Sequence, residues 1–508
     1  GGESCGAHLN AGESRWFVLP VRTLGQVSRP AEYAESRARW ITEADIEELR
    51  RQHLAWWCAF WDVSEITVGD PVLEQRYYLS QYMMGSLSRD PDYPPCIFGI
   101  CTSDRPAWNG NYKINYNHQT PYLGLLVSGH DAQADPHDAP YLDLLDLTRE
   151  MSRRLLGHEG ACYPLGLGPH GMVSEALLLH MKSPAVHGAL NMIWRYRLTL
   201  DEAYGRRVYP FLLSVADFWE KDLVLRDGVY HVVGDGMHER ISSDVEQNGL
   251  PEDPCNTLGY LRTFFTALTE ISADLGLDED RRDSWREIAA HLAPYPVGTI
   301  GEIRENPTLW AEAEFPLSEL VPEEWMNRPV FYDEGKGGKW SLHFPGNVMQ
   351  IFPGDAIGLS SPPQELETAR STIHVHALME DALGEKLRKQ QEERGGDGAV
   401  GDFNVPAGGA EADPHFYKSG AWNSMNLSAL FFPAAVRTGY DPEVIWRELR
   451  ERILRRGLPN GFFAQNPHGI ENLSLVPVTL QEMMLQSHDR ILRLFPVWPV
   501  KTHPQASF

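Results

Sequence analysis

The sequence predicts an all-α protein, an (α/α)6 toroid of six helical hairpins with long active-site loops. Helical periodicity recurs in about a dozen stretches, these come in consecutive pairs, and strand-like alternation is nearly absent between them. The chain has 508 residues, which exceeds the usual size of a single domain. Paired helices over such a length match a toroid of hairpins better than a small bundle.

The first elements show how the helices are recognised. Residues 1–40 are expected to form an irregular lead-in with a short apolar piece at Trp16–Pro20. Thr42 and Asp45 resemble a capping box, so a helix is expected from there to about Trp61. Pro71 suits the first turn of a second helix. Further helices are expected near 119–129, 140–156, 172–181, 187–198, 201–224, 256–276, 279–292, 363–389, 421–437, 441–456 and 475–487.

The loops between these helices have unequal lengths, and loops at one rim of a toroid would carry the chemistry. The longest are expected at 88–118, 226–255, 295–360 and 391–420. We therefore divide the chain into a lead-in segment (1–40), a catalytic domain (41–500) and a short piece (501–508) that would begin a missing or truncated C-terminal β-domain.

Amino-acid composition limits which binding partners and which kinds of site are expected for this chain. The net charge of −25 repels phosphate backbones, so nucleic acid is not an expected partner. No run of about 18 apolar residues exists, so no membrane span is expected. The six cysteines contain no CxxC pair and are too sparse for a zinc site or a disulfide scaffold. The compartment stays open, with a periplasmic or secreted location favoured over a cytoplasmic one.

Two patterns that formally match binding motifs are better explained by local structure. Gly166–Gly171 fits GxGxxG, but Pro169 lies inside the turn and no βαβ unit surrounds it, so a tight loop is expected. His130–Asp138 contains five possible metal ligands in a segment rich in turn residues, which is typical of a loop. We expect no metal and no cofactor.

Carboxylate chemistry is what the remaining residues favour, because GxSxG, P-loop and HExxH signatures are missing. Asn115 and Asn117, if extended, project from one face of the backbone and could hold a water between two amides. The alternative is a pair of turn asparagines bonded to their own backbone. Glu239 lies in a polar loop and Glu471 lies just before a helix, where an acid also interacts well with the helix dipole.

Several segments, in order, resemble the catalytic domain of glycoside hydrolase family 95, the inverting α-L-fucosidase and α-L-galactosidase family of the six-hairpin glycosidases. The resemblance covers roughly residues 65–500. It is carried by Pro94–Gly99, Pro106–Trp108, Tyr112–Asn117, Trp194 with Ala203–Leu212, Leu292–Tyr295, Ile351–Asp355, Glu482–His488 and Ile491–Pro499.

The resemblance implies roles for these residues. Glu239 falls on the family's general acid, Glu471 on its general base, and Asn115 and Asn117 on the pair that positions the attacking water. The implied activity is exo-acting, inverting hydrolysis of a terminal sugar from an oligosaccharide or polysaccharide, with an α-L-configured sugar as one expected case. The candidate sugar-binding residues are Trp108, His118, Trp194, His238, His343 and Asn472.

The chain also departs from the family pattern. The family's SPEN is Met237–Arg240 here, the Asp of its base is Glu471, and of its HRHxSH segment only His343 is kept. The sugar is therefore open, and three alternatives stand: a non-catalytic carbohydrate-binding protein on a toroid scaffold, a disaccharide phosphorylase, or a polysaccharide lyase. Retention of a carboxylate at position 471 favours hydrolysis over all three. Flanking β-domains or a homo-oligomer are possible partners.

Overall fold

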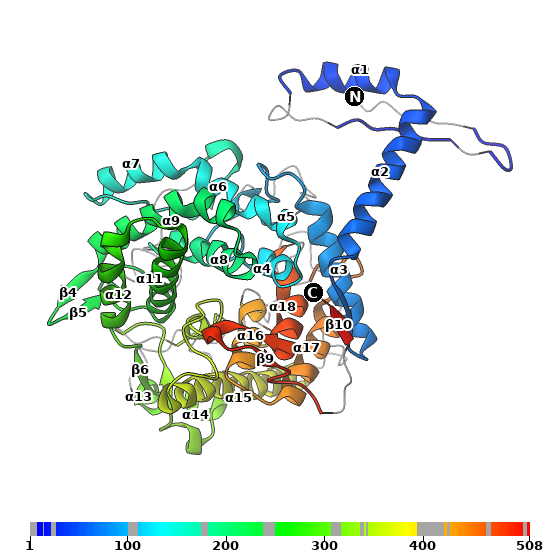
Figure 1. The fold of residues 1–508 in the computed structure, drawn as a ribbon. Helices are drawn as coiled ribbons and strands as arrows, with labels where there is room; N and C mark the ends of the chain where they lie inside the picture. Colours follow the sequence, from blue (N-terminus) through cyan, green and yellow to red (C-terminus); the bar gives the residue numbers. More distant parts are fainter. Residues whose placement is uncertain are drawn as a thin grey trace. The chain divides into compact units, whose positions relative to one another are not determined.

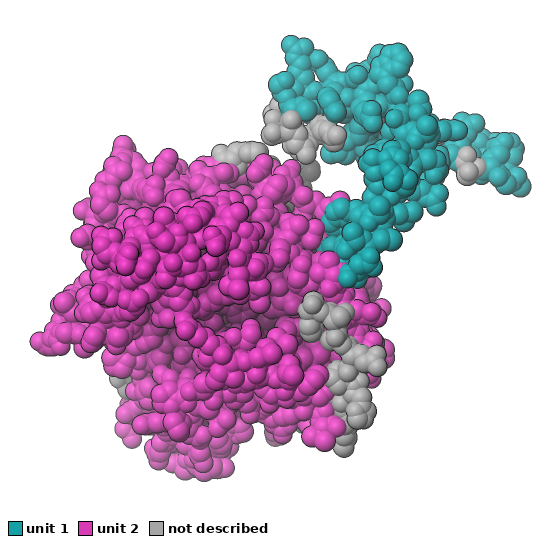
Figure 2. Space-filling view, in the orientation of Figure 1, with its two compact units in different colours: residues 1–62 teal, residues 63–508 magenta. Residues whose placement is uncertain are grey.

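The computed structural model contains two compact units, Gly1–Asp62 and Val63–Phe508 (Figure 2). The residues that the structure describes are 8–13, 15–21, 27–99, 110–173, 181–236, 249–305, 316–335, 340–341, 344–393, 421–423, 427–463, 469–500 and 505–507. No helix among them is both long enough and apolar enough to cross a bilayer.

Among its described residues, the first unit contains the helices α1 (Pro30–Trp40) and α2 (Glu43–Trp61). The capping box that begins α2 is present: the Thr42 side chain accepts from the Asp45 amide, and the Asp45 side chain accepts from the Thr42 amide. Helix α1 differs from the expected irregular lead-in, and Pro30 stands in its first turn, where proline is well tolerated.

The second unit is a ring of inner elements surrounded by outer helices, in strict alternation along the chain. Each inner element packs on the next: α4 on α8, α8 on α11, α11 on η7, η7 on α16, α16 on α18, and α18 back on α4 (Figure 1). The inner elements are α4 (Thr120–Leu126), α8 (Pro184–Thr199), α11 (Cys255–Leu275), η7 (Gly346–Val348), α16 (Ser428–Arg437) and α18 (Leu475–Met484).

The outer helices come one before each inner element and are the amphipathic members of each hairpin. On α12, for example, only Trp285 and Ile288 are buried, whereas all ten residues of α18 are buried. The outer helices are α3 (Pro71–Leu87), α7 (Leu145–Leu155), α9 (Glu202–Asp222), α12 (Arg282–His291), α15 (Pro363–Glu393) and α17 (Pro442–Arg456). The predicted all-α toroid of six hairpins is confirmed, with a 3-10 turn in place of the fourth inner helix.

The remaining elements of the described residues are short helices, 3-10 turns and strands. The additional helical pieces are α5 (Asp131–Ala134), η2 (Asp135–His137), α6 (Ala139–Asp143), η3 (Pro169–Gly171), η4 (Glu279–Arg281), α13 (Ile300–Glu305), α14 (Leu317–Leu320), η6 (Glu323–Trp325), η10 (Glu471–Ser474) and η11 (His488–Arg490). The strands form antiparallel pairs: β1 (Glu65–Thr67) with β10 (Gln505–Ser507), β2 (Tyr112–Lys113) with β3 (Gly166–Leu167), β4 (Val224–Arg226) with β5 (Val229–His231), β6 (Val297–Thr299) with β7 (Pro329–Phe331), and β8 (Leu485–Gln486) with β9 (Arg493–Leu494).

Two sequence expectations are resolved by this arrangement. The GxGxxG segment forms β3 and η3, and β3 pairs antiparallel with β2, so the parallel βαβ unit of a dinucleotide site is not what surrounds it. The helix expected at 172–181 is not formed at residues 172 and 173, and residues 174–180 lie outside the described part.

Candidate functional site at the N-terminal end of the inner ring

The candidate site lies where the inner elements begin. Because an outer helix separates each inner element from the next, successive inner helices run in the same direction and their N-termini share one end of the ring. The polar side chains that the described residues place at this end, all buried, are Asn115, Asn117, Asp235, Thr257, Asn347, Ser428, Glu471 and Asn472.

Asn115 and Asn117 lie in the turn that leads into α4. This corrects the expectation of an extended segment: the chain turns here, with the His118 amide bonded to the Lys113 carbonyl at 2.8 Å. Both side chains are buried, with 9% and 6% of their surface exposed. The turn is fixed by His187 of α8, whose Nδ1–H donates to the Asn115 carbonyl at 2.8 Å. Burial lowers the pKa of His187 to about 4, so the ring is neutral.

Glu471 and Asn472 begin η10, directly before α18, and both are almost completely buried. The preceding amide, that of Ile470, donates to the Ile97 carbonyl at 2.9 Å. Turn η10 packs against α4, and a Cβ added at Gly124 of α4 would lie 3.2 Å from the Ser474 Cα. Glycine therefore allows α4 and η10 to approach closely. Glu471 thus begins an element that packs against the helix directly following the asparagine turn, although Asn117 and Glu471 are more than 350 residues apart in sequence.

The two other predicted site residues with described positions are His118 and Trp194, and both are buried. His118 is buried, and its Nε2–H donates to the His137 carbonyl at 3.0 Å. Burial lowers its pKa to about 3. Trp194 lies ten residues into α8, about 15 Å along the axis from the N-terminal end. Its ring packs against Phe352 and the Arg437 guanidinium. Trp108, His238, Glu239 and His343 lie outside the described residues.

Asp235 occupies a central place at this end of the ring, four residues before Glu239. Its carboxylate accepts from the amides of Lys182 and Ser183 at 2.5 and 3.2 Å, and from the Thr257 hydroxyl at 2.6 Å. These bonds join the starts of α8 and α11. Complete burial raises the pKa of Asp235 to about 6, although the donors partly offset that effect. From the sequence, Asp235 was one of several acids in its loop.

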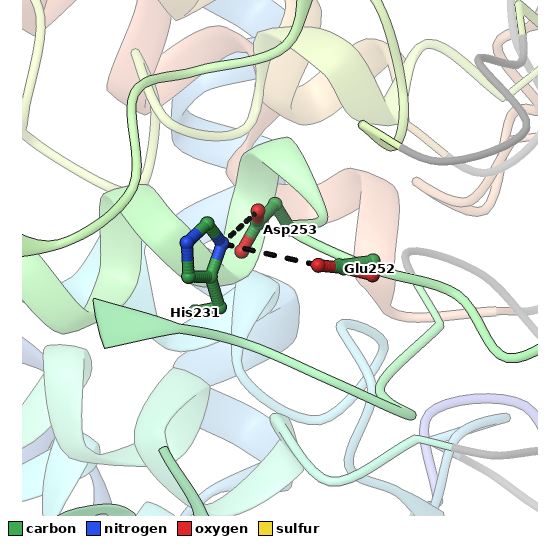
Figure 3. A group of neighbouring side chains, drawn as sticks. All are labelled: His231, Glu252 and Asp253. Carbon is green, nitrogen blue, oxygen red and sulfur yellow. Dashed lines mark hydrogen bonds and ion pairs between the residues drawn. The ribbon is translucent and has the colours of Figure 1, made fainter. Parts of the chain in front are cut away.

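A cluster of His231, Glu252 and Asp253 lies at the base of the same loop (Figure 3). This cluster was not predicted from the sequence. His231 Nδ1 lies 2.8 Å from Asp253 Oδ2 and 3.9 Å from Glu252 Oε1, and the three residues could hold a cation. Their existing partners offer another explanation. Asp253 Oδ1 accepts from the Val232 amide, and Arg226 bonds Glu252 at 2.5 Å, so the group joins residues 231–232 to 252–253.

The other possible metal cluster proves to be an ion-pair network. Asp135 accepts from Arg195 at 2.6 Å and from Arg207 at 2.7 Å, and Asp138 accepts from Arg207 at 2.8 Å. The two guanidinium groups lie over the Tyr204 ring. The acids of this segment therefore tie the α5–α6 region to α8 and α9, as expected for structural residues.

A cavity of about 770 Å³ lies elsewhere, along the C-terminal parts of α8 and α11 and along α12. It is lined by ion-paired side chains such as Arg197 with Glu270, and Tyr196 bonded to Asp274. It is remote from the N-terminal end of the ring, where Glu471 and the buried amides lie. The volume of a cavity therefore does not mark the candidate site, whereas the chemistry of the side chains does.

Comparison with known proteins identifies the family. The family model described as the glycosyl hydrolase family 95 catalytic domain matches residues 61–384, more than half of the chain. The chain belongs to glycosyl hydrolase family 95. The match includes Asn115, Asn117 and the position of Glu239, whereas Glu471 and Asn472 lie beyond its end. Among curated proteins, none matches the sequence significantly.

A solved structure with a similar fold supports the toroid fold of this family 95 protein. A candidate kojibiose phosphorylase from the human microbiome has 13% identity and a TM-score of 0.53; the alignment covers 93% of this chain and 64% of that protein. The chain thus spans about two thirds of that protein's length. Two glycosidase structures, each with 13% identity, 81% coverage of this chain and 97% of their own, have TM-scores of 0.46 and 0.47.

Proposed function

We propose that this family 95 protein is an exo-acting inverting glycoside hydrolase that removes a terminal sugar from a glycan. One observation carries the proposal. The turn with Asn115 and Asn117 leads directly into α4, α4 packs against η10, and η10 begins with Glu471, at the end of the ring where the inner elements begin. In this proposal Glu471 is the general base, the two asparagines hold the water, and Glu239 is the general acid.

The chemistry requires two carboxyl groups on opposite faces of the sugar. Glu471 accepts a proton from the water as the water attacks the anomeric carbon, while Glu239 protonates the departing glycosidic oxygen. An inverting pair stands roughly 6.5–9.5 Å apart, so that the water fits between base and sugar. An amide side chain both donates and accepts, so Asn115 and Asn117 can orient the water's lone pair toward carbon and its hydrogen toward Glu471.

The surroundings support Glu471 as a base that works with little bulk water. Its side chain is completely buried, and the side chains of Asn115 and Asn117 are nearly so. Electrostatic interactions are stronger in such a water-poor environment than in solvent. The carboxylate at position 471 also favours water as the nucleophile, because a phosphorylase would need a cationic pocket for phosphate there.

The experiment is a screen of aryl glycosides and oligosaccharides, in which NMR follows the anomer of the first product. We expect the released sugar to have the configuration opposite to that of the substrate. Glu471→Gln and Glu239→Gln should each lower kcat by at least about 10³-fold. Glu443→Gln, an exposed acid at the start of α17, is the control and should keep full activity.

Other outcomes would replace the proposal. Full activity of both glutamine variants would show that the assigned carboxylates are wrong. Cleavage that depends on inorganic phosphate would identify a phosphorylase. Binding of glycans without turnover of any substrate would identify a carbohydrate-binding protein.

A further inference from the structure

Two buried arginines from outer helices contact residues 461–463, which follow α17. Arg76 of α3 donates to the Gly461 carbonyl at 2.6 Å. The Phe463 ring contacts both arginines, with the guanidinium carbons of Arg76 and of Arg452 on α17 lying 4.9 and 5.5 Å from its centre. Such cation–π contacts suit arginine in a desolvated place.

Arg452 differs from the other arginines of α17 that have described pairs. Arg447 and Arg455 are more than half exposed and Arg450 is 43% exposed; they pair with Glu448, Glu451 and Asp70. Arg452 is 1% exposed, and burial lowers its pKa to about 9, so the group stays charged at neutral pH. A buried charge is costly unless it is well bonded, so its contacts indicate a specific task.

The contact of interest joins Arg452 to the residue that follows the proposed base. Arg452 Nη2 donates to Asn472 Oδ1 at 3.4 Å, and the Ser428 hydroxyl at the start of α16 donates to the same oxygen at 3.1 Å. Two donors from two different helices thus fix the Asn472 side chain. Because Glu471 and Asn472 are consecutive residues of one tight turn, fixing Asn472 limits the backbone of Glu471 as well.

We propose that Arg452 is a positioning residue for hydrolysis: through Asn472 it fixes turn η10 and thereby the direction of the Glu471 carboxylate. This inference rests on the proposed function. Arg452 does not touch the substrate in this arrangement; it acts from an outer helix through an amide. A shift of about 1 Å in a catalytic group can cost about 10²-fold in rate, so the contact can matter although it is remote from the sugar.

The test compares Arg452→Met and Arg452→Lys with Arg76→Met. Loss of positioning should lower kcat by about 10-fold to 10²-fold in Arg452→Met and leave KM within about threefold. The lysine variant should recover part of kcat. Arg76→Met also removes a buried arginine that contacts residues 461–463, but Arg76 does not bond Asn472. This variant should therefore have a lower thermal midpoint and an unchanged kcat. If kcat is equally low in Arg76→Met, Arg452 has only a structural role, and the inference is overturned.

Two further measurements distinguish positioning of Glu471 from a purely structural role of Arg452. In a double-mutant cycle, Arg452→Lys should have little further effect on kcat in an Asn472→Ala background, because both act through one contact. Additive effects of the two substitutions on kcat would contradict the proposal that Arg452 acts through Asn472. Hydrogen exchange needs no activity: amides of residues 470–474, including Leu473 bonded to Ile470, should exchange faster in Arg452→Met than in Arg76→Met. Unchanged exchange would refute positioning even if Glu471→Gln is inactive, whereas faster exchange with a fully active Glu471→Gln would refute only the proposed base.

Discussion

Glu380 provides the most direct test of how burial controls charge in this protein. It lies on α15, and its carboxyl accepts from the Trp422 amide at 2.6 Å and from Asn423 Nδ2 at 2.5 Å. Complete burial raises the pKa of Glu380 to about 8, an effect that these donors reduce without cancelling. At neutral pH the side chain is therefore mostly protonated.

The pKa shift makes stability depend on pH with a defined sign. The ordinary value is 4.5, so between about pH 4.5 and pH 8 the unfolded chain has lost this proton while the folded protein keeps it. The free energy of unfolding therefore falls as the pH rises through this window and levels off above it. The difference between the two pKa values corresponds to about 5 kcal/mol at most.

Glu380→Gln is neutral at every pH, and its Oε1 can still accept from the Trp422 amide. We expect it to match the wild type near pH 4.5 and to exceed it by about 2–5 kcal/mol at pH 9. For a unit of this length that is a few degrees in thermal midpoint. The assay is scanning fluorimetry between pH 4.5 and 9, with urea denaturation at both ends of the range.

The control is Glu367→Gln on the same helix, since Glu367 is exposed and pairs only loosely with Arg328 at 3.8 Å. Its difference from the wild type should be small at every pH. A constant gap between Glu380→Gln and the wild type, or a wild type that becomes more stable from pH 5 to 8 relative to the variant, would refute the reasoning.

Three further predictions concern the ring and the site. Arg437→Met should destabilise by about 3–5 kcal/mol in a urea titration, because it leaves the buried carboxylate of Glu482 without its cation and leaves Asp355 with Arg197 alone. Gly259→Ala should destabilise by about 1–3 kcal/mol, because its methyl would lie 2.4 Å from a Cβ of the η7 segment. Asn117→Ala should lower kcat by about 10²-fold in the glycoside assay if its amide holds the water.

Each has a control from the same chain. Arg447→Met removes only a surface pair and should change stability by less than about 1 kcal/mol; an equal loss would contradict the role of burial. Gly384→Ala on α15 meets no heavy atom within 4 Å and should be neutral or stabilising; matching destabilisation in both alanine variants would refute the packing argument. Exposed Asn327→Ala should keep kcat, and an Asn117→Ala enzyme equally active would remove Asn117 from the mechanism.

Most of the helices could be predicted because their signals are local. The capping box at Thr42, the proline at the start of α3 and the long pattern of α11 each depend on residues within a few turns. The fourth inner position could not be predicted. It is a 3-10 turn at Gly346–Val348 inside a stretch expected to be a long loop, and three residues have no periodicity to detect.

Some residues of the candidate site could also be predicted from the sequence, and others could not. Asn115, Asn117 and Glu471 were selected by motif, yet the asparagines lie in a turn and not in the extended segment from which their shared face was argued. Asp235 and Glu380 are ordinary acids in the sequence. Their raised pKa values come from burial by segments that are distant in the chain.

The sequence by itself determined the helical alternation, the family and the acidic surface, since these depend on composition, short-range pattern and ordered motifs. Only the tertiary structure decided which polar groups meet. Arg76 bonds a carbonyl 385 residues away, and Arg452 reaches Asn472 from an outer helix. Such contacts depend on closure of the ring, which brings first and last hairpins together, and no local window of the sequence contains both partners.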